Sequence, residues 1–252
     1  MKLFIITFNA LLILSSFISF VSHADEVTVV IEDYDYPPRY FSLPDKSLAG
    51  IEIELVKEFF KRTGDKYNIT LCPWKRCLKL MEVGQADVMP YLLKRPDREE
   101  YMHYIEPPYQ KEANKCFYIK KGSSVKIDAY EDLYQYSIGV ADSAKYFDPF
   151  DTDLKIKKEI VIKEKLLPEM LIAERMEAFI GACIPTDFNN IKNGHDNQLS
   201  KSTYQFSSHN PAYVAMSKKS KFIAKFSDYE KVMQQLVDEG VVNEIIARFL
   251  EN

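Results

Sequence analysis

The stretch from Leu71 to Tyr109 constrains the fold more than any other part of the chain. It begins at the end of an expected strand and continues into a helix that opens at Pro73-Trp74 and stops at Gly84. A proline in the first helical turn and a glycine just past the last one are usual helix boundaries. A short buried strand is expected from Asp87 to Tyr91, followed by a loop that contains Arg98. This layout places a guanidinium and several aromatic side chains at the end of a sheet strand, where open α/β folds bind small ligands.

The alternation of short apolar runs and amphipathic stretches continues along the chain. Apolar positions within Ile51–Phe60 predict a helix that ends at Gly64, and the β-branched run Val27–Ile31 predicts the first strand. This repeated order of strand and helix indicates an α/β architecture. The other expected elements are strands at Tyr67–Leu71, Cys116–Lys121, Tyr136–Val140, Ile160–Ile162, Ala178–Cys183 and Ala212–Met216, helices at Tyr130–Tyr134, Leu166–Met176 and Phe222–Leu250 with a break at Gly240, and a polar surface loop at Asp187–Ser202.

The N-terminus has the pattern of a secretory signal peptide. Met1-Lys2 precedes an apolar run from Leu3 to Val21, and small residues follow up to Ala24. An uncleaved membrane anchor is the alternative, but polar residues interrupt the run, which is barely long enough to span a bilayer. We therefore expect residues 1–24 to be removed on export, before Asp25, and the mature protein to be soluble.

Composition excludes some functions. The formal net charge is −4 and 46% of the residues are hydrophobic, which is compatible with a packed core. The sequence shows no basic stripe that would favour nucleic acid binding. It also shows no ligand cluster for a metal, and no cofactor is expected. Length alone allows one or two domains.

Four cysteines are expected to meet an oxidising compartment if the chain is exported. Cys72 and Cys77 are close enough to close a small disulfide loop across the start of the Trp74 helix, which stabilises by roughly 2 kcal/mol. A zinc site is a weaker alternative because no histidine pair lies nearby. Cys116 and Cys183 are either buried thiols or a second disulfide.

Several segments together resemble one family. Residues Pro73 to Tyr109 resemble the PW…G…D…R…DPY pattern of bacterial periplasmic solute-binding proteins of the polar amino-acid type (family 3 extracellular solute-binding proteins, type II periplasmic-binding fold). The similarity extends to Asp33-Tyr34-Asp35-Tyr36-Pro37-Pro38, to AGIEIELVKEFFKRTG at Ala49–Gly64, and to the closing helix. It covers essentially the whole mature chain.

The resemblance implies two lobes, each a mostly parallel sheet flanked by helices, joined by two hinge segments. Lobe one would comprise residues 25–113 and 214–252, and lobe two residues 114–213, with hinges near Asn114–Phe117 and His209–Tyr213. It implies a monomer that binds a small polar or anionic, amino-acid-like solute. The bound solute would be delivered to an inner-membrane permease of the ABC type or to a sensor.

The resemblance also nominates ligand contacts in the first lobe. Asp33 and Tyr36 match positions that lie against the ligand, although loop aromatics packed on the surface are the alternative. Trp74 is the single tryptophan and is either a stacking wall or a core residue. Arg76 lies in the first helical turn, where a cation gains nothing from the helix dipole, so it is either an anion contact or simply exposed.

Arg98 matches the arginine that holds the ligand carboxylate in this family. A planar guanidinium suits that role because it donates two parallel hydrogen bonds. The alternative is a surface ion pair with Asp97, Glu99 or Glu100, which contributes little.

Two positions depart from the family pattern. The family's hydroxyl position falls on Leu93, near which Tyr91 is a further candidate contact, and the family's amine-binding Asp falls on Ala182. The protein therefore keeps the fold but is not expected to read an ordinary α-amino acid.

Ser143 is the remaining candidate. It lies in ADSAKYF, where a strand-to-helix turn is expected, and its hydroxyl together with backbone amides suits an anion. Ser143 serves equally well as a helix N-cap without any ligand.

Two classes of function remain open. The first is non-catalytic binding, and the second is an enzyme on the same fold, since cyclohexadienyl dehydratases also resemble this family. Glu32, Asp33 and Glu106 are the candidate acids or bases, but the sequence shows no second partner for them. His103 is interpreted as structural.

Overall fold

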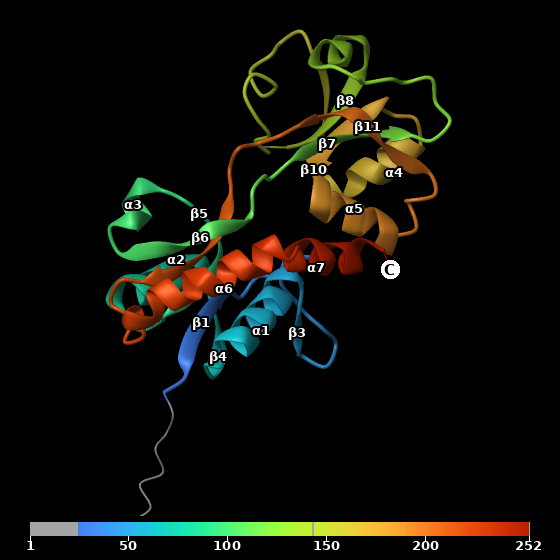
Figure 1. Cartoon of the computed structure of the whole chain (residues 1–252). Coiled ribbons are helices and arrows are strands. Elements are labelled where there is room, and N and C mark those ends of the chain that lie inside the picture. The colour runs from blue at the N-terminus through green and yellow to red at the C-terminus, as the bar shows by residue number, and fades with distance from the viewer. Residues whose placement is uncertain (1–24, 143, 252) are drawn as a thin grey trace, which may run out of the picture.

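The computed structural model describes residues 25–142 and 144–251, which form two lobes (Figure 1). The sheet of the first lobe has the strand order β4-β1-β5-β12-β6. Strand β1 is parallel to β4 and β5, whereas β12 is antiparallel to β5 and β6. The strands are β1 (Val27–Glu32), β4 (Tyr67–Cys72), β5 (Val88–Leu93), β6 (Met102–Gln110) and β12 (Ala212–Ser217).

Helices cover both faces of this first sheet. One face packs on α1 (Ile51–Thr63), α6 (Phe226–Asp238) and α7 (Val241–Leu250), and the other on α2 (Trp74–Val83). The predicted boundaries of α1 and α2 are confirmed, because Gly64 and Gly84 end them in the left-handed conformation (φ 73° and 77°) that favours glycine. The lobe also contains α3 (Pro96–Glu99), the 3₁₀ helix η3 (Ile223–Lys225), and the short hairpin of β2 (Phe41–Ser42) and β3 (Leu48–Ala49).

The second lobe has a sheet of its own, with the strand order β11-β7-β10-β8-β9. Strands β8, β9 and β10 are parallel, and β7 is antiparallel to β10 and β11. Its elements are β7 (Lys115–Lys120), β8 (Ser137–Ala141), β9 (Lys157–Val161), β10 (Ala178–Ala182), β11 (Leu199–Phe206), the 3₁₀ helices η1 (Tyr130–Gln135) and η2 (Glu164–Leu166), α4 (Leu167–Ile172) and α5 (Cys183–Lys192).

Two chain segments connect the lobes, one from β6 to β7 and the other from β11 to β12 (Figure 1). They lie side by side, because the Ala113 amide donates to the Ser208 carbonyl (3.3 Å) and the Ser208 hydroxyl donates to the Ala113 carbonyl (2.7 Å). The fold is therefore the expected two-lobe, type II periplasmic-binding architecture.

Three local predictions for the second lobe were wrong. The expected loop Asp187–Ser202 contains the last turns of α5 and the start of β11. Its run of asparagines hides the helix, since asparagine is a weak helix former and the packing of the buried Asn190 overrides that preference. The strand expected to include Cys183 ends at Ala182, and the helix expected over Leu166–Met176 shortens to α4.

The helix expected after ADSAKYF is also wrong for the described residues. After β8 the chain from residue 144 to 156 makes turns instead. The carboxylate of Asp151 accepts hydrogen bonds from the Tyr146 amide (3.1 and 3.0 Å), which closes this loop without a helix. Ser143 and the expected signal peptide, residues 1–24, lie outside the described residues.

Within residues 25–142 and 144–251, no helix has both the length and the apolar character that crossing a bilayer requires.

Candidate interlobe binding site

Two cavities lie between the lobes. The smaller, of about 150 Å³, is lined by Tyr36, Arg39 and Tyr91 from the first lobe, and by Lys115 and the start of α5 from the second. The larger, of about 540 Å³, shares Tyr36 and Lys115 and extends past Tyr146 and Glu164. Cavities that both halves of a hinged protein line are the natural place for a ligand.

A larger groove of about 790 Å³ runs between α1 and α7 on the first lobe. Several of its charged side chains are already ion-paired, since Arg62 bonds both Glu58 (3.1 Å) and Glu239 (2.6 Å). This groove is therefore a solvated, ion-paired surface, and the interlobe cavities are the better candidate site.

Tyr36 reaches the cleft from a tight turn after β1. The Tyr36 amide donates to the Tyr40 carbonyl and the Arg39 amide donates to the Tyr36 carbonyl, both at 2.8 Å. The Tyr36 ring centroid lies 6.2 Å from that of Tyr91. Burial raises the pKa of the Tyr36 hydroxyl well above its usual value, so the group stays neutral.

Tyr91 is held in an unusual backbone conformation. Its φ of 58° is in the left-handed region, which is costly for a bulky side chain and is often retained at functional positions. The pairing of β5 with β12 shifts register beside it, between Tyr213 and Ala215. The distortion turns the Tyr91 ring toward Tyr36 and under the guanidinium of Arg39, whose Cζ lies 4.6 Å from the ring centroid.

Arg39 belongs to a buried ionic network that sequence reasoning missed. Its Nη1 donates to Glu52 Oε1 (3.0 Å), and the Tyr109 hydroxyl donates to the same oxygen (2.9 Å). The exposed fractions are 3% for Arg39 and 0% for Glu52, so the pair lies outside bulk water. Burial lowers the pKa of Arg39, but the attraction of the Glu52 carboxylate and its other neighbours raises it by more. The guanidinium therefore stays charged. The one signal in the sequence is an acid, Glu52, on the apolar stripe of α1.

Trp74 and Arg98 form a second stacked pair on the same lobe. Arg98 Cζ lies 5.2 Å from the Trp74 ring centroid, and its Nη1 donates to the Leu93 carbonyl (3.3 Å). With an exposed fraction of 9%, Arg98 is no surface ion pair, and Asp97 bonds Arg95 instead (2.9 Å). Neither Trp74 nor Arg98 lines the two interlobe cavities.

The remaining first-lobe candidates also lie apart from the cavities. Asp33 and Arg76 are exposed and line neither of them. His103 packs its ring 5.1 Å from that of Phe226 on α6, as its structural interpretation predicted. Of the sequence-predicted site residues that the structure describes, Tyr36 and Tyr91 are thus the two that meet at the interlobe cavities.

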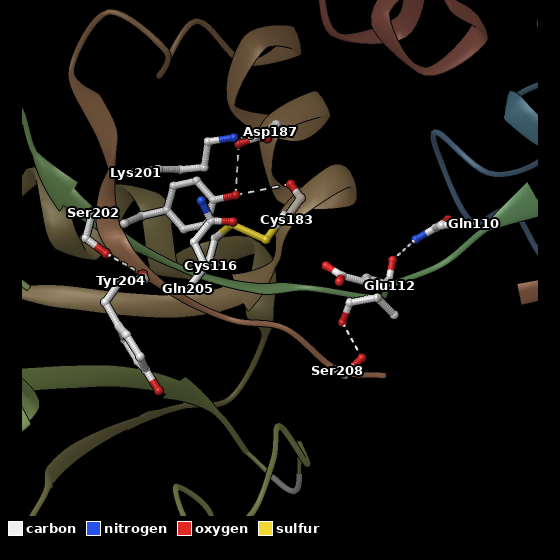
Figure 2. The surroundings of a disulfide bond; sticks show 12 residues. Gln110, Glu112, Cys116, Cys183, Asp187, Lys201, Ser202, Tyr204, Gln205 and Ser208 are labelled. Carbon is white, nitrogen blue, oxygen red and sulfur yellow. Dashed lines mark hydrogen bonds and ion pairs between the residues drawn. A yellow bond between two sulfur atoms is a disulfide. The ribbon is translucent and has the colours of Figure 1, made fainter. Parts of the chain in front are cut away.

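Both cysteine pairs are disulfides. Cys72–Cys77 is confirmed, which excludes the zinc alternative there, and Cys116–Cys183 adopts the second of its two alternatives. Figure 2 shows that the latter ties β7 to the first residue of α5. Beside this disulfide, the Tyr118 hydroxyl bonds the Cys183 carbonyl (3.1 Å) and Asp187 (2.9 Å). The second-lobe wall of the cavities is therefore rigid.

A separate contact joins the lobes beside the cleft. The rings of Phe41 (β2), Phe249 (α7) and Phe188 (α5) lie with centroids 6.1 to 6.5 Å apart. Figure 1 shows α7 running beneath α5, in agreement with this cluster.

The model of the family described as bacterial extracellular solute-binding proteins, family 3, matches residues 27–252 of this sequence. The chain belongs to this family. Members of the family are solute receptors of amino-acid type, secreted or periplasmic, and the fold of this chain agrees with that of solved receptors.

Three solved structures illustrate the similarity. The second substrate-binding domain of GlnP from Lactococcus lactis, in an open conformation, has a TM-score of 0.76 at 18% identity over 90% of this chain and 96% of that one. The unliganded, open L-cystine solute receptor of Neisseria gonorrhoeae has a TM-score of 0.76 at 15% identity, covering 91% and 94%. A histidine kinase sensor domain similar to periplasmic binding proteins has a TM-score of 0.56 at 16% identity, covering 89% and 96%.

Proposed function

We propose that this protein is a non-catalytic receptor that captures a small polar or anionic, amino-acid-like solute between its two lobes. The observation that carries the proposal is that both interlobe cavities are lined by side chains from both lobes, notably Tyr36 and Lys115. A ligand in such a place adds contacts when the lobes close and therefore shifts the protein toward the closed form.

The first-lobe wall supplies shape and polarity for such a solute. Tyr36 and Tyr91 present aromatic faces and neutral hydroxyl groups, and Arg39 supplies positive charge beneath them. Aromatic walls with a few placed polar groups are typical of small-molecule sites.

Delivery of the bound solute to an ABC-type transporter or to a sensor is part of the proposal. Structural neighbours include domains of both kinds, a transporter's substrate-binding domain and a histidine kinase sensor domain. Because the expected signal peptide directs export, we propose that the protein is periplasmic and is cleaved before Asp25. We also propose that it is a monomer. Intact mass of periplasmic material tests the cleavage, and a mass that includes Met1 contradicts it.

The candidate acids named from the sequence do not support an enzyme on the same fold. Glu32 accepts a hydrogen bond from the Tyr40 hydroxyl (3.1 Å) and Glu106 pairs with Lys94 (3.2 Å). Neither these acids nor Asp33 lines the interlobe cavities. We expect prephenate and arogenate to remain unconsumed on prolonged incubation with the purified protein, and formation of phenylpyruvate or phenylalanine contradicts the binding-only proposal.

Ligand-free protein decides the proposed function. Unfolding and refolding remove any ligand that copurifies, and a metabolite screen then records shifts in melting temperature. We expect at least one small solute to stabilise the protein, because a ligand that binds the native state alone raises its stability. The same solute should reduce the radius of gyration in solution scattering. Stabilisation without compaction contradicts closure of the lobes.

A further inference from the structure

Lys115 is the cationic side chain that lines both interlobe cavities. It is the first residue of β7, and its cross-strand neighbour on β10 is Ala182, the last residue before α5. Residues directly opposite in an antiparallel pair project from the same face of the sheet. The second lobe therefore presents an ammonium beside a methyl group at the cleft end of its sheet.

The Lys115 ammonium has no partner of its own. Across residues 25–142 and 144–251, no hydrogen bond or ion pair to this group is formed, although the side chain is partly buried. Burial lowers the pKa of Lys115, and the more distant carboxylates of Glu164 and Asp151 act in the opposite direction. Glu164 lines the larger cavity together with Lys115 but does not bond it. A partly buried ammonium without a directly bonded acceptor is unfavourable, and a ligand carboxylate placed against it would relieve that cost.

The opposite wall of the smaller cavity carries Arg39, whose charge is paired with the buried carboxylate of Glu52. The Nε of Arg39 has no hydrogen-bond partner in the described chain, although the side chain is 3% exposed. The acid that lines this cavity, Glu112, is exposed at the hinge, where the neighbouring polar side chains of Ser207 and Asn114 lower its pKa. In this cavity of about 150 Å³ a ligand ammonium would meet the Lys115 ammonium and the Arg39–Glu52 ion pair, whereas a ligand carboxylate would meet an ammonium that no carboxylate bonds directly.

On the basis of the receptor function proposed above, we propose that Lys115 is a ligand-binding residue. It holds the carboxylate of an organic acid that lacks an α-ammonium group. Asn114 and Gln110, which line the same cavity, each have a buried side-chain oxygen without a donor among the described residues. A hydroxyl on the ligand satisfies such an acceptor without adding positive charge. The ligand class is therefore an organic acid, with 2-hydroxy acids as the first candidates.

Matched compounds test the class directly. One series is 3-phenyllactate, phenylpyruvate, phenylalanine and phenethylamine, and a second is 2-hydroxy-4-methylpentanoate, leucine and 3-methylbutylamine. Calorimetry on ligand-free protein should detect binding by acids without an ammonium group and none by the amines. Every hit of the metabolite screen is scored by the same rule. Binding by α-amino acids but not by the acids overturns the inference and leaves the receptor function standing. If no compound binds in the series or the screen, the receptor function and the inference fall together.

Variants test the residue. Lys115→Met keeps the side-chain length and removes the charge, and we expect it to weaken binding of the best acid roughly 30-fold or more. Lys115→Arg should recover most of the affinity, because it restores the cation. Lys126→Met is the matched control, since Lys126 is an exposed lysine of the second lobe that lines neither interlobe cavity, and it should bind as the wild type does.

The double variant Lys115→Met/Ala182→Asp replaces the positive wall by a negative one. It should lose the acids and gain affinity for the corresponding α-amino acid or amine. Melting temperatures of all variants show whether each is folded. Wild-type affinity for the acid in a folded Lys115→Met variant overturns the assignment.

Discussion

Arg39 and Arg98 are two buried arginines of the first lobe that stack on aromatic rings but have different partners. Arg39 lies over Tyr91 and Arg98 lies over Trp74, at 4.6 and 5.2 Å from the ring centroids. Both are almost fully buried, and the Nε of each has no hydrogen-bond partner within the described part of the chain. Arg39 pairs with a buried carboxylate and lines the cleft, whereas Arg98 bonds a backbone carbonyl and lines neither interlobe cavity. An arginine stacked on an aromatic ring therefore lines the cleft in one case and lies away from it in the other. The two arginines also differ in the group that each one bonds.

The largest expected difference is in stability. Arg39→Met leaves the Glu52 carboxylate buried without its cation, and we expect it to lower the free energy of unfolding by about 3–5 kcal/mol at pH 7. Arg98→Met, the matched control, strands no buried acid and should lose less. Urea unfolding of both variants measures the difference, and equal losses contradict it.

The difference in unfolding free energy between the Arg39→Met and Arg98→Met variants should depend on pH. Burial raises the pKa of Glu52, and Arg39 opposes that rise, so removing Arg39 raises the pKa further. An acid whose folded pKa is raised destabilises the native state above that pKa and ceases to do so once protonated. The Arg39→Met penalty should therefore shrink as the pH falls from 7 toward the raised pKa of Glu52. A penalty independent of pH between 7 and 5 contradicts a buried charged Glu52 in the variant.

The next effect concerns the Trp74 side of the comparison. Cys72 and Cys77, separated by 5 residues, close the loop that carries Trp74. Cys72→Ser/Cys77→Ser should lower the free energy of unfolding by about 2 kcal/mol through the entropy of the unfolded chain. Ligand affinity should hardly change, because Trp74 is outside the cavities. A large loss of affinity in a variant that still folds would indicate that the ligand binds near Trp74.

Replacing Arg98 distinguishes a role in ligand binding from a role in packing on Trp74. The family resemblance predicts that losing Arg98 costs about 2–5 kcal/mol of binding, with Arg98→Lys nearly as poor as Arg98→Ala. The observed packing on Trp74 predicts instead that Arg98→Ala loses about 1–2 kcal/mol of stability and less than about tenfold in affinity. We expect the second outcome. Calorimetry and urea unfolding of both variants decide, and a strong loss of binding at unchanged stability supports the family's contact.

The smallest expected effect needs no mutation. Trp74 is the single tryptophan, so intrinsic fluorescence reports on the Arg98 side of the comparison alone. A ligand held between Tyr36, Tyr91 and Lys115 should change the tryptophan emission only slightly at saturation. Strong quenching or a large spectral shift would place the ligand against Trp74.

Candidate site residues were harder to predict than secondary structure. Tyr36 and Tyr91 were named from the sequence and meet at the cavities, but Arg39 and Lys115 were not named. Arg39 is distinguished by a hydrogen bond to Glu52, 13 positions away. Lys115 is distinguished by having no hydrogen bond or ion pair within the part of the chain that the structure describes. Neither property is visible in a single sequence, because both depend on which side chains the fold brings together.

The sequence by itself determined the local architecture. The apolar stripe of α1 with Gly64, the boundaries of α2 at Pro73 and Gly84, the break between α6 and α7 at Gly240, and the Cys72–Cys77 disulfide follow from residues a few positions apart. Such signals act through backbone conformation and short loops, so they survive without tertiary context.

Only the tertiary structure decided the chemistry of the cleft. It converted an asparagine-rich stretch into the end of α5, joined Cys116 to Cys183 across 67 residues and buried Arg39 against Glu52. It also left Lys115 at a cavity without a hydrogen bond or ion pair to any described residue. The physical reason is that burial and charge pairing depend on distance in space. Distance along the chain does not predict them once two lobes fold against each other.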